Sequence, residues 1–209
     1  MRGLICLLLA AAFATAANAA DVSVSLRNAK GQPVSDAVVA VYVAGGPSSG
    51  PVKFDWPYRL AQQNLMFDPF VLVVPTGAVV SFPNRDAVRH QVYSFSPTHP
   101  FELKLYGKDE TRTVRFDKAG VVAVGCNIHD SMVAFIKVVD TPYAIKSDAA
   151  GQAVLHGVPA GTVTLRVWHP YQKGPGNEIV RPLTVPKDGV VRETVAMDVH
   201  SPPMRPSAY

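Results

Sequence analysis

Proline and glycine interrupt this sequence so often that long helices have little room to form. The chain of 209 residues contains 18 prolines and 15 glycines, and the segments between them are mostly short apolar runs. Proline lacks a backbone N–H and breaks helices, whereas glycine marks turns. Short apolar runs between such breakers are typical of β-strands, so the sequence predicts an all-β fold.

The composition supports a packed core and excludes one class of function. Hydrophobic residues make up 48% of the chain and charged residues 17%, which is typical of a globular protein. The formal net charge is only +4, and no block of Lys and Arg forms a phosphate-binding stripe. We therefore expect no nucleic-acid partner. The length allows one large domain or two small ones.

The N-terminal segment has the three parts of a secretory signal peptide. A positive start at Met1-Arg2 precedes an apolar run at residues 4–12, and Ala17-Asn18-Ala19 is an A-x-A cleavage site. We predict cleavage after Ala19, which makes the protein periplasmic or otherwise exported. A membrane anchor is the weaker interpretation, because the run is shorter than the ~20 residues that span a bilayer. No later segment predicts a membrane span.

Removal of the leader also removes one of the two cysteines. Cys6 lies in the apolar run, so Cys126 is left as a lone thiol in a protein sent to an oxidising compartment. It has no internal partner for a disulfide. An intermolecular disulfide, a reactive thiol and a metal ligand are the alternatives, and the neighbouring residues favour a metal ligand.

Cys126, His129 and Met132 recur at every third position of one short segment. Upstream, a strand-like run is followed by a polar turn, and His90 opens the next strand-like run. Two imidazoles, one thiolate and a weak thioether form the ligand set of a blue-copper electron-transfer site. Zinc favours Cys, His and carboxylate ligands over methionine. We therefore predict one copper ion, Cu(I) or Cu(II), held by His90, Cys126, His129 and Met132.

With these residues in place, residues 60–140 resemble the cupredoxin family of blue-copper proteins, and its amicyanin-like members in particular. The short gap between His129 and Met132 is the amicyanin-like feature, because plastocyanin-like proteins usually have a longer one. The resemblance implies a Greek-key β-sandwich with the metal at one end. The motifs that carry it are Phe67-Asp68-Pro69 before residues 71–74, Gly77 before residues 79–82, Asn84-Arg85-Asp86 before His90, Phe116-Asp117 with Gly120, and Cys126, His129 and Met132.

One position near the ligands departs from the family. Cupredoxins often carry Asn after the first histidine, where it ties the two ligand loops together, and this chain has Gln91 there. Asn127, directly after the cysteine, is the candidate for a related role. Such hydrogen bonds tune the reduction potential, so its value does not follow from the sequence.

Four of the six histidines lie outside the ligand pattern. His99 lies in a turn-like stretch between two prolines. We expect His156, His169 and His200 to be structural or exposed residues.

The segments on either side of residues 60–140 form a second pattern. Residues 22–26 alternate between apolar and polar, a turn signal follows, and residues 33–42 read as a second strand, so we expect an N-terminal hairpin. Further strands are expected after residue 143, including residues 179–185 and 190–199. Gly31-Gln32-Pro33 and Ala37-Val38-Val39 resemble the opening of the carboxypeptidase-regulatory-like, or transthyretin-like, β-sandwich.

This second resemblance implies that one domain interrupts another. Residues 21–46 and 141–200 would form the split transthyretin-like sandwich, with the cupredoxin domain at 60–140 inserted into it. The alternative is an N-terminal hairpin that extends the cupredoxin sheet. Residues 201–209 contain three prolines and no periodicity, which predicts a disordered tail.

Three classes of function remain for such a site. For a single-electron carrier, the resemblance implies that His129 lies near the surface, beside apolar residues such as Ile128 and Val133. A redox protein, for example a c-type cytochrome or a dehydrogenase, would dock there. A copper carrier or metallochaperone needs the same ligands and stays the alternative. An enzyme is least favoured, because the chain has no His-x-His pair and no nucleophile-elbow motif.

Overall fold

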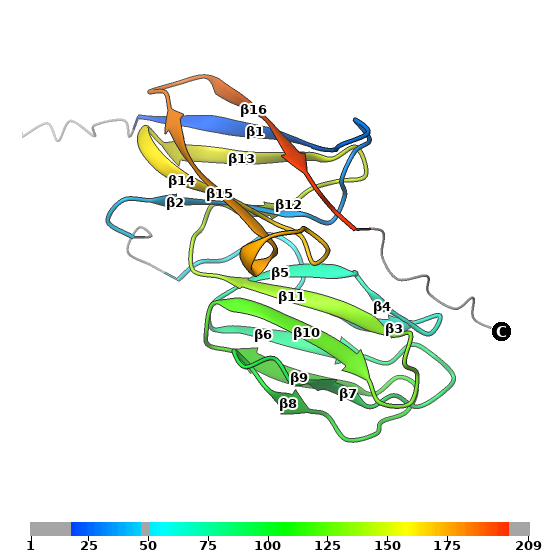
Figure 1. The fold of residues 1–209 in the computed structure, drawn as a ribbon. Helices are drawn as coiled ribbons and strands as arrows, with labels where there is room; N and C mark the ends of the chain where they lie inside the picture. Colours follow the sequence, from blue (N-terminus) through cyan, green and yellow to red (C-terminus); the bar gives the residue numbers. More distant parts are fainter. Residues whose placement is uncertain (1–17, 47–50, 201–209) are drawn as a thin grey trace, which may run out of the picture.

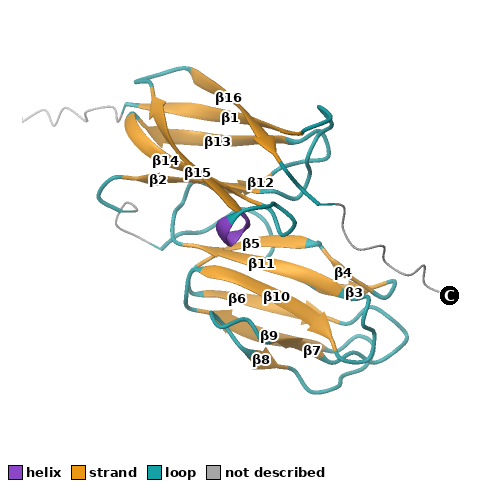
Figure 2. Ribbon diagram, viewed as in Figure 1, coloured by secondary structure: helices purple, strands orange, loops and turns teal. Residues whose placement is uncertain are grey.

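The computed structural model describes residues 18–46 and 51–200, which form two β-sandwiches (Figure 1). The described part contains 16 strands and one short 3-10 helix, η1 (Pro175–Asn177), and Figure 2 shows strands throughout both sandwiches. The all-β prediction is therefore confirmed. Most of the predicted leader and the predicted disordered tail at 201–209 lie outside the described residues, as do residues 47–50. No helix in the described ranges is long and apolar enough to cross a bilayer.

The first sandwich combines strands from both ends of the chain. One sheet has the order β13-β1-β16 and the facing sheet the order β12-β2-β14-β15. Their bounds are β1 (Ala19–Asn28), β2 (Val38–Val43), β12 (Ala144–Lys146), β13 (Gln152–Pro159), β14 (Gly161–Trp168), β15 (Glu178–Val185) and β16 (Val190–Met197).

Alternation of side chains explains how β1 builds this sandwich. Val22, Val24 and Leu26 are fully buried in its core, whereas the residues between them are less buried. Successive side chains of a strand point to opposite faces, so these three share the inner face. β1 is antiparallel to β13 and parallel to β16. It therefore lies in the middle of its sheet. The residue before the predicted cleavage point, Ala19, pairs with Pro159 in this strand.

The expected N-terminal hairpin is wrong in its pairing. β1 and β2 belong to different sheets and do not pair with each other. The second strand also begins at Val38 instead of Pro33. Pro33 has no N–H to donate, and Asp36 has a φ of 59°, a left-handed conformation that an extended strand excludes. Residues 33–37 therefore form a connection from one sheet to the other.

The second sandwich contains the residues of the predicted copper site. Its main sheet has the order β5-β11-β10-β7-β8, and β6 pairs with β9 and β3 with β4 in two smaller sheets. The bounds are β3 (Ala61–Gln63), β4 (Met66–Asp68), β5 (Val71–Pro75), β6 (Ala78–Pro83), β7 (Val92–Ser94), β8 (Phe101–Glu102), β9 (Thr111–Phe116), β10 (Gly120–Cys126) and β11 (Val133–Val139).

Each sandwich has its own apolar core, and a third cluster lies between them. β2 and β14 of the first sandwich face β5 and β11 of the second (Figure 1). The Phe135 ring packs edge-on against Trp168, with ring centroids 6.0 Å apart. Lys137 and Glu178 form a largely buried ion pair of 3.1 Å across the same contact. The division into a split domain and an inserted domain stays a prediction.

Candidate metal centre

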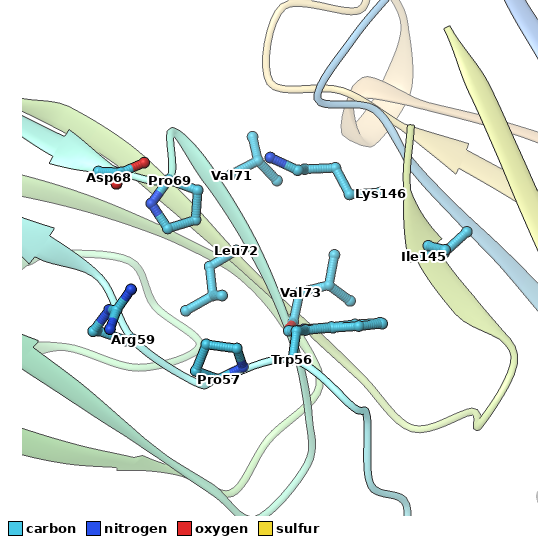
Figure 3. A pocket seen from close by; sticks show the side chains of 10 residues that line it. All are labelled: Trp56, Pro57, Arg59, Asp68, Pro69, Val71, Leu72, Val73, Ile145 and Lys146. Atoms are coloured by element: carbon cyan, nitrogen blue, oxygen red, sulfur yellow. The ribbon is translucent and has the colours of Figure 1, made fainter. Parts of the chain in front are cut away.

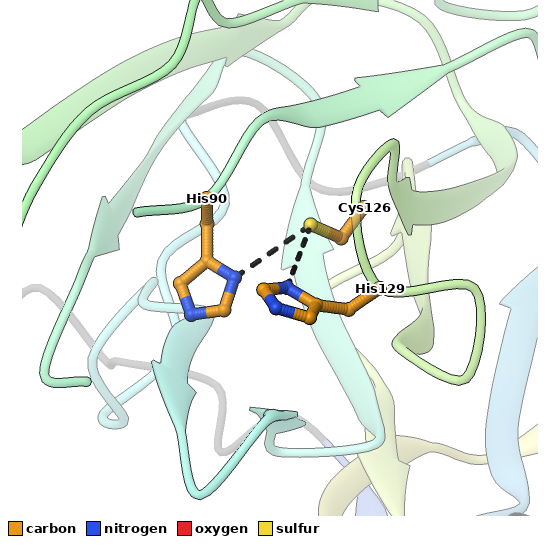
Figure 4. A group of neighbouring side chains, drawn as sticks. All are labelled: His90, Cys126 and His129. Carbon is orange, nitrogen blue, oxygen red and sulfur yellow. Dashed lines mark hydrogen bonds between the residues drawn. The ribbon is translucent and has the colours of Figure 1, made fainter. Parts of the chain in front are cut away.

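Three predicted ligands meet at one end of the second sandwich. The ligand atoms of His90, Cys126 and His129 all lie within 4.8 Å of one another. The Sγ atom of Cys126 is 3.6 Å from Nδ1 of His90 and 3.7 Å from Nδ1 of His129. Figure 4 shows both imidazoles turned toward this sulfur. No other group of three His, Cys, Asp or Glu side chains in the described ranges is placed to hold a metal.

Strand β10 places the cysteine. Val122, Val124 and Cys126 alternate along β10 and all three are buried, so Cys126 follows the inward-facing residues of a half-exposed strand. Gly125 lies on the outer face, where a Cβ atom would come within 3.0 Å of the Tyr93 ring of β7. Glycine at this position therefore allows β7 to pack closely beside the cysteine.

The two histidines come from different loops. His90 lies two residues before the start of β7. Two backbone hydrogen bonds with Tyr106 fix it: the His90 N–H donates to the Tyr106 carbonyl at 3.1 Å, and the Tyr106 N–H donates to the His90 carbonyl at 3.0 Å. His129 lies in the loop between β10 and β11. That loop is closed by the Met132 N–H, which donates to the His129 carbonyl at 2.9 Å.

The site is buried apart from one histidine. His90 is 0% exposed, Cys126 2% and Met132 1%, whereas His129 is half-buried. Met132 belongs to the same apolar cluster as Cys126, and its role as the fourth ligand stays a prediction. The arrangement is a buried group of side chains that reaches the surface at His129.

Asp86 was not assigned a role by the sequence, although it stands in one of the motifs. Its carboxylate accepts a hydrogen bond from Nε2 of His90 at 2.8 Å. Because an ionised carboxylate only accepts, Nε2 must carry the proton, and the lone pair of Nδ1 is left facing Cys126. Carboxylates that fix the tautomer of a ligand histidine in this way are common around metal sites.

Asn84 holds the loop that carries both Asp86 and His90. Its side-chain Nδ2 donates to the carbonyls of Val88 and Tyr106, at 2.8 and 3.3 Å, and its Oδ1 accepts from the Asp86 N–H at 2.9 Å. The residue is almost fully buried. These bonds make the polar turn before His90 a defined structure.

Hydrogen bonds lower the pKa of the Cys126 thiol. Burial raises the pKa of Cys126, but hydrogen bonding with the His90 ring, with the backbone N–H groups of Ile128 and Gln91, and with the His129 ring outweighs burial and lowers the pKa to about 6. Burial lowers the pKa of His90, but its hydrogen bonds with Cys126 and Asp86 outweigh this and raise it. The pocket therefore favours a thiolate, which is the form that binds metals.

Gln91 and Asn127 connect the two ligand loops. The Asn127 N–H donates to the Gln91 carbonyl at 3.0 Å, and Asn127 Nδ2 donates to Gln91 Oε1 at 3.2 Å. Gln91 Nε2 donates in turn to Glu102. The tie that the sequence suggested for Asn127 is thus present as a hydrogen bond.

The other histidines lie away from this group. The ring of His99 packs against Phe116, with centroids 4.6 Å apart. On the first sandwich, Nδ1 of His156 forms a hydrogen bond of 2.9 Å with the Asp21 carboxylate. His169 is buried, which lowers its pKa to about 4, and its Nδ1 accepts from the Tyr171 N–H. His200 donates its backbone N–H to Tyr171.

No protein-family model and no curated protein matches this sequence. Solved structures do match parts of the chain. A copper-containing nitrite reductase from Thermus scotoductus SA-01 is 26% identical with a TM-score of 0.39, over 47% of this chain and 27% of that one. A purple cupredoxin from Nitrosopumilus maritimus is 19% identical with a TM-score of 0.36, over 39% of this chain and 98% of that one.

A reduced amicyanin variant is also similar, with 19% identity and a TM-score of 0.38 over 48% of this chain and 98% of that one. Each of these matches covers less than half of the present chain, and the matched region spans about a quarter of the nitrite reductase. The case for a metal centre therefore rests on the side-chain geometry of His90, Cys126 and His129.

Proposed function

We propose that this protein is an exported type 1 copper protein that carries single electrons between redox proteins. The observation that carries the proposal is the convergence of the His90, Cys126 and His129 ligand atoms within 4.8 Å. A copper ion bound there would supply one-electron chemistry, by accepting and releasing an electron.

The donor chemistry fits copper. A thiolate and two imidazoles suit both Cu(I) and Cu(II), and the neighbouring Met132 offers a soft thioether as a weak fourth ligand. Structural zinc sites use four Cys or His ligands, which this group does not supply. The lowered pKa of Cys126, about 6, means that the thiol need not compete strongly with a proton at neutral pH.

Burial of the ligands favours electron transfer over copper delivery. His90 and Cys126 are almost inaccessible, and Met132 is buried beside them. A metallochaperone must bring its ligands within reach of an acceptor's ligands, which buried side chains do not allow. Copper delivery stays the second candidate because it needs the same donor atoms.

The half-buried His129 is the proposed point of contact with a redox partner. Ile128 is 49% exposed and Val133 37%, so both sides of the loop that carries His129 present apolar surface. Small apolar contacts suit the weak, short-lived encounters of electron-transfer proteins. The partner would be a redox protein such as a c-type cytochrome or a dehydrogenase.

The proposed protein is exported and acts as a carrier instead of an enzyme. The predicted leader with its Ala17-Asn18-Ala19 site supports export. Catalytic metal sites keep a position open for water or substrate. The proposed set of three strong donors and Met132 already supplies four ligands, and three of these residues are almost fully buried, which supports a carrier over an enzyme.

Copper titration tests the site directly. We expect the full chain to bind one Cu(II) and to show an intense visible absorption from the thiolate. Cys126→Ala should abolish the colour, because the thiolate carries the transition. Met132→Leu should keep the colour but change the reduction potential, because the weak axial ligand tunes the potential of the copper. Met197→Leu, at a buried methionine of the first sandwich, is the matched control and should change neither.

Two results would contradict the proposal. A wild-type protein that stays colourless with Cu(II), or a Cys126→Ala variant that stays coloured, would exclude the copper site. A coloured protein that surrenders its Cu(I) to a chelator within seconds would favour copper delivery over electron transfer. A reversible one-electron wave with the copper retained would support the electron carrier.

A further inference from the structure

A cavity of about 310 Å³ lies where the two sandwiches meet, and none of the four proposed copper ligands lines it. Its walls come from the segment before β3, from the end of β4, from β5 and from β12. Figure 3 shows Trp56, Leu72 and Val73 around its centre, with Arg59 and Asp68 on one side and Ile145 and Lys146 on the other. Small-molecule sites often lie at such junctions, and this volume is at the lower end of their range.

The walls of the cavity are held rigid. The indole Nε1–H of Trp56 donates to the carbonyl of Val73 at 2.8 Å, and the ring stacks on Phe54 with centroids 4.5 Å apart. Pro57 and Pro69, which also line the cavity, have fixed φ angles. An indole held by a hydrogen bond and a stacked ring cannot swing in to fill the space, so the cavity is a preformed apolar slot.

Two opposite charges on one side of the slot are unpaired. Within the described part of the chain, neither Arg59 nor Asp68 has an ion pair or a side-chain hydrogen bond. The pairing of Ala61 with Asp68 brings the start of β3 and the end of β4 together, which places both charges at the same rim. Lys146, on the other side, is already paired with Asp36 at 2.6 Å.

We propose that this cavity binds a small zwitterion with an apolar body, the chemistry of an α-amino acid with an aromatic or branched side chain. The Arg59 guanidinium would pair with the carboxylate, which its planar fork suits. Asp68 would accept from the ammonium group, and the side chain would lie against Trp56 and Leu72. A simple anion would meet the charge of Asp68, and a simple cation that of Arg59, so the paired rim selects a molecule that carries both.

The ligand would contact both sandwiches, because Leu72 and Val73 belong to β5 and Ile145 to β12. The site is independent of the proposed copper function and can be measured on metal-free protein. The probes are L-phenylalanine, hydrocinnamate, which lacks only the ammonium group, and phenylalanine methyl ester, which lacks the carboxylate.

Isothermal titration of the metal-free full chain tests the proposal. We expect phenylalanine to bind one to one, and each analogue to bind roughly tenfold or more weakly, because each leaves one rim charge unpaired. Arg59→Gln and Asp68→Asn should each weaken phenylalanine binding by a similar factor. Both residues are exposed, so the fold should survive, and unchanged circular dichroism would verify this. Arg192→Gln, at an exposed arginine of β16, is the matched control and should bind like wild type.

The outcomes separate cleanly. Absence of binding with about 10 mM phenylalanine or leucine, a concentration that would reveal even millimolar affinity, would overturn the proposal. Equal affinity for hydrocinnamate would show a site for apolar anions and overturn the zwitterion assignment. Loss of affinity in Arg59→Gln and Asp68→Asn alone would support it.

Discussion

At the scale of single residues, Asp86 links the His90 imidazole to the turn between β3 and β4. Besides accepting from Nε2 of His90, its carboxylate accepts from the N–H groups of Asn64 and Leu65, at 2.6 and 3.2 Å. The side chain is 12% exposed, so the charge is only partly screened by water. One carboxylate thus orients the imidazole and places a negative charge behind it.

Replacing Asp86 should change both the reduction potential of the copper-loaded protein and the free energy of unfolding of the metal-free protein. In Asp86→Asn we expect the reduction potential of the copper-loaded protein to rise. The negative charge of Asp86 stabilises the more positive, oxidised site, and the variant loses this stabilisation. The scale is about 60 mV for each ~1.4 kcal/mol. In metal-free Asp86→Ala, the free energy of unfolding should fall by about 1 kcal/mol, because two N–H groups lose their acceptor. Voltammetry and urea denaturation measure the two effects.

A nearby carboxylate provides the control for this prediction. Asp130 lies on the ligand loop beside His129 and is exposed. Asp130→Asn removes the same charge without touching His90. Equal shifts of the reduction potential in Asp86→Asn and Asp130→Asn would mean that the lost charge alone sets the shift. That result would contradict a positioning role for Asp86.

The role of Asp86 shows where residue-level prediction stops. The sequence predicted His90, Cys126, His129 and Met132 as a ligand set, because three of them fall within seven positions beside a strand, and the structure brings His90, Cys126 and His129 together. It could not identify Asp86 or Asn84 as supporting residues. Asp86 depends on the β3–β4 turn, about 20 residues earlier in the chain, and Asn84 bonds Tyr106, which lies beyond β7 and β8. Spacing within a loop does not specify which of these groups meet.

At the scale of elements, the two ligand loops are joined by the pair Gln91 and Asn127. One backbone and one side-chain hydrogen bond connect them. Both side chains lie near the surface, so each bond contributes little to stability and the pair acts mainly by fixing the loops against each other. Gln91, directly after His90, is thus tied to Asn127, directly after Cys126.

A double-mutant cycle should reveal this tie. We expect Gln91→Ala and Asn127→Ala, tested by urea denaturation of metal-free protein, to show a coupling energy of about 0.5–1 kcal/mol. As a control, Gln91→Ala combined with Gln32→Ala should be additive, because Gln32 bonds Asn28 on the other sandwich. A coupling energy of zero for Gln91 with Asn127 would show that the side-chain bond does not hold the loops.

Strand existence was more predictable than strand pairing. The alternation in residues 22–26 correctly predicted β1, and residues 179–185 and 190–199 correspond to β15 and β16. Alternation is a local property, so it is visible in the sequence. Pairing depends on contacts between distant segments: β1 pairs with β13 and β16, more than 120 positions away. The expected hairpin was wrong because a turn at residues 28–32 reverses the chain without joining the two strands in one sheet.

At the scale of the whole molecule, the second sandwich interrupts the first along the sequence: the strands of the first sandwich come before and after those of the second. Strands β1 and β2 complete sheets whose other members come after residue 143. Two of the four proposed metal ligands, Cys126 and Met132, belong to a different core. This arrangement supports the split-domain prediction, which calls for a test of whether the two parts fold separately.

Excision of the second sandwich depends on where the cut is made. The Tyr58 carbonyl accepts from the Ser81 N–H, and the Leu60 N–H donates to the Ser81 carbonyl. A fragment of residues 51–140 keeps both bonds, and a fragment of residues 60–140 loses the first. Both would uncover Val71, Val73 and Phe135, which pack against the first sandwich in the full chain. Exposed apolar surface of this kind reduces solubility, so the full chain is the better material for a domain test.

Deletion of residues 21–44 is that test. It removes β1 from between β13 and β16, and β2 from between β12 and β14. The remaining strands would expose unpaired edges and the apolar faces that Val22, Val24 and Val39 cover. We expect limited proteolysis to digest residues 141–200 rapidly, while copper titration still gives the visible absorption of the full chain, because an inserted domain keeps its own core. The full chain, digested in parallel, should resist. Loss of the copper absorption together with a protease-resistant C-terminal region would show instead that the N-terminal strands stabilise the metal-binding sandwich, and that the domain is not split.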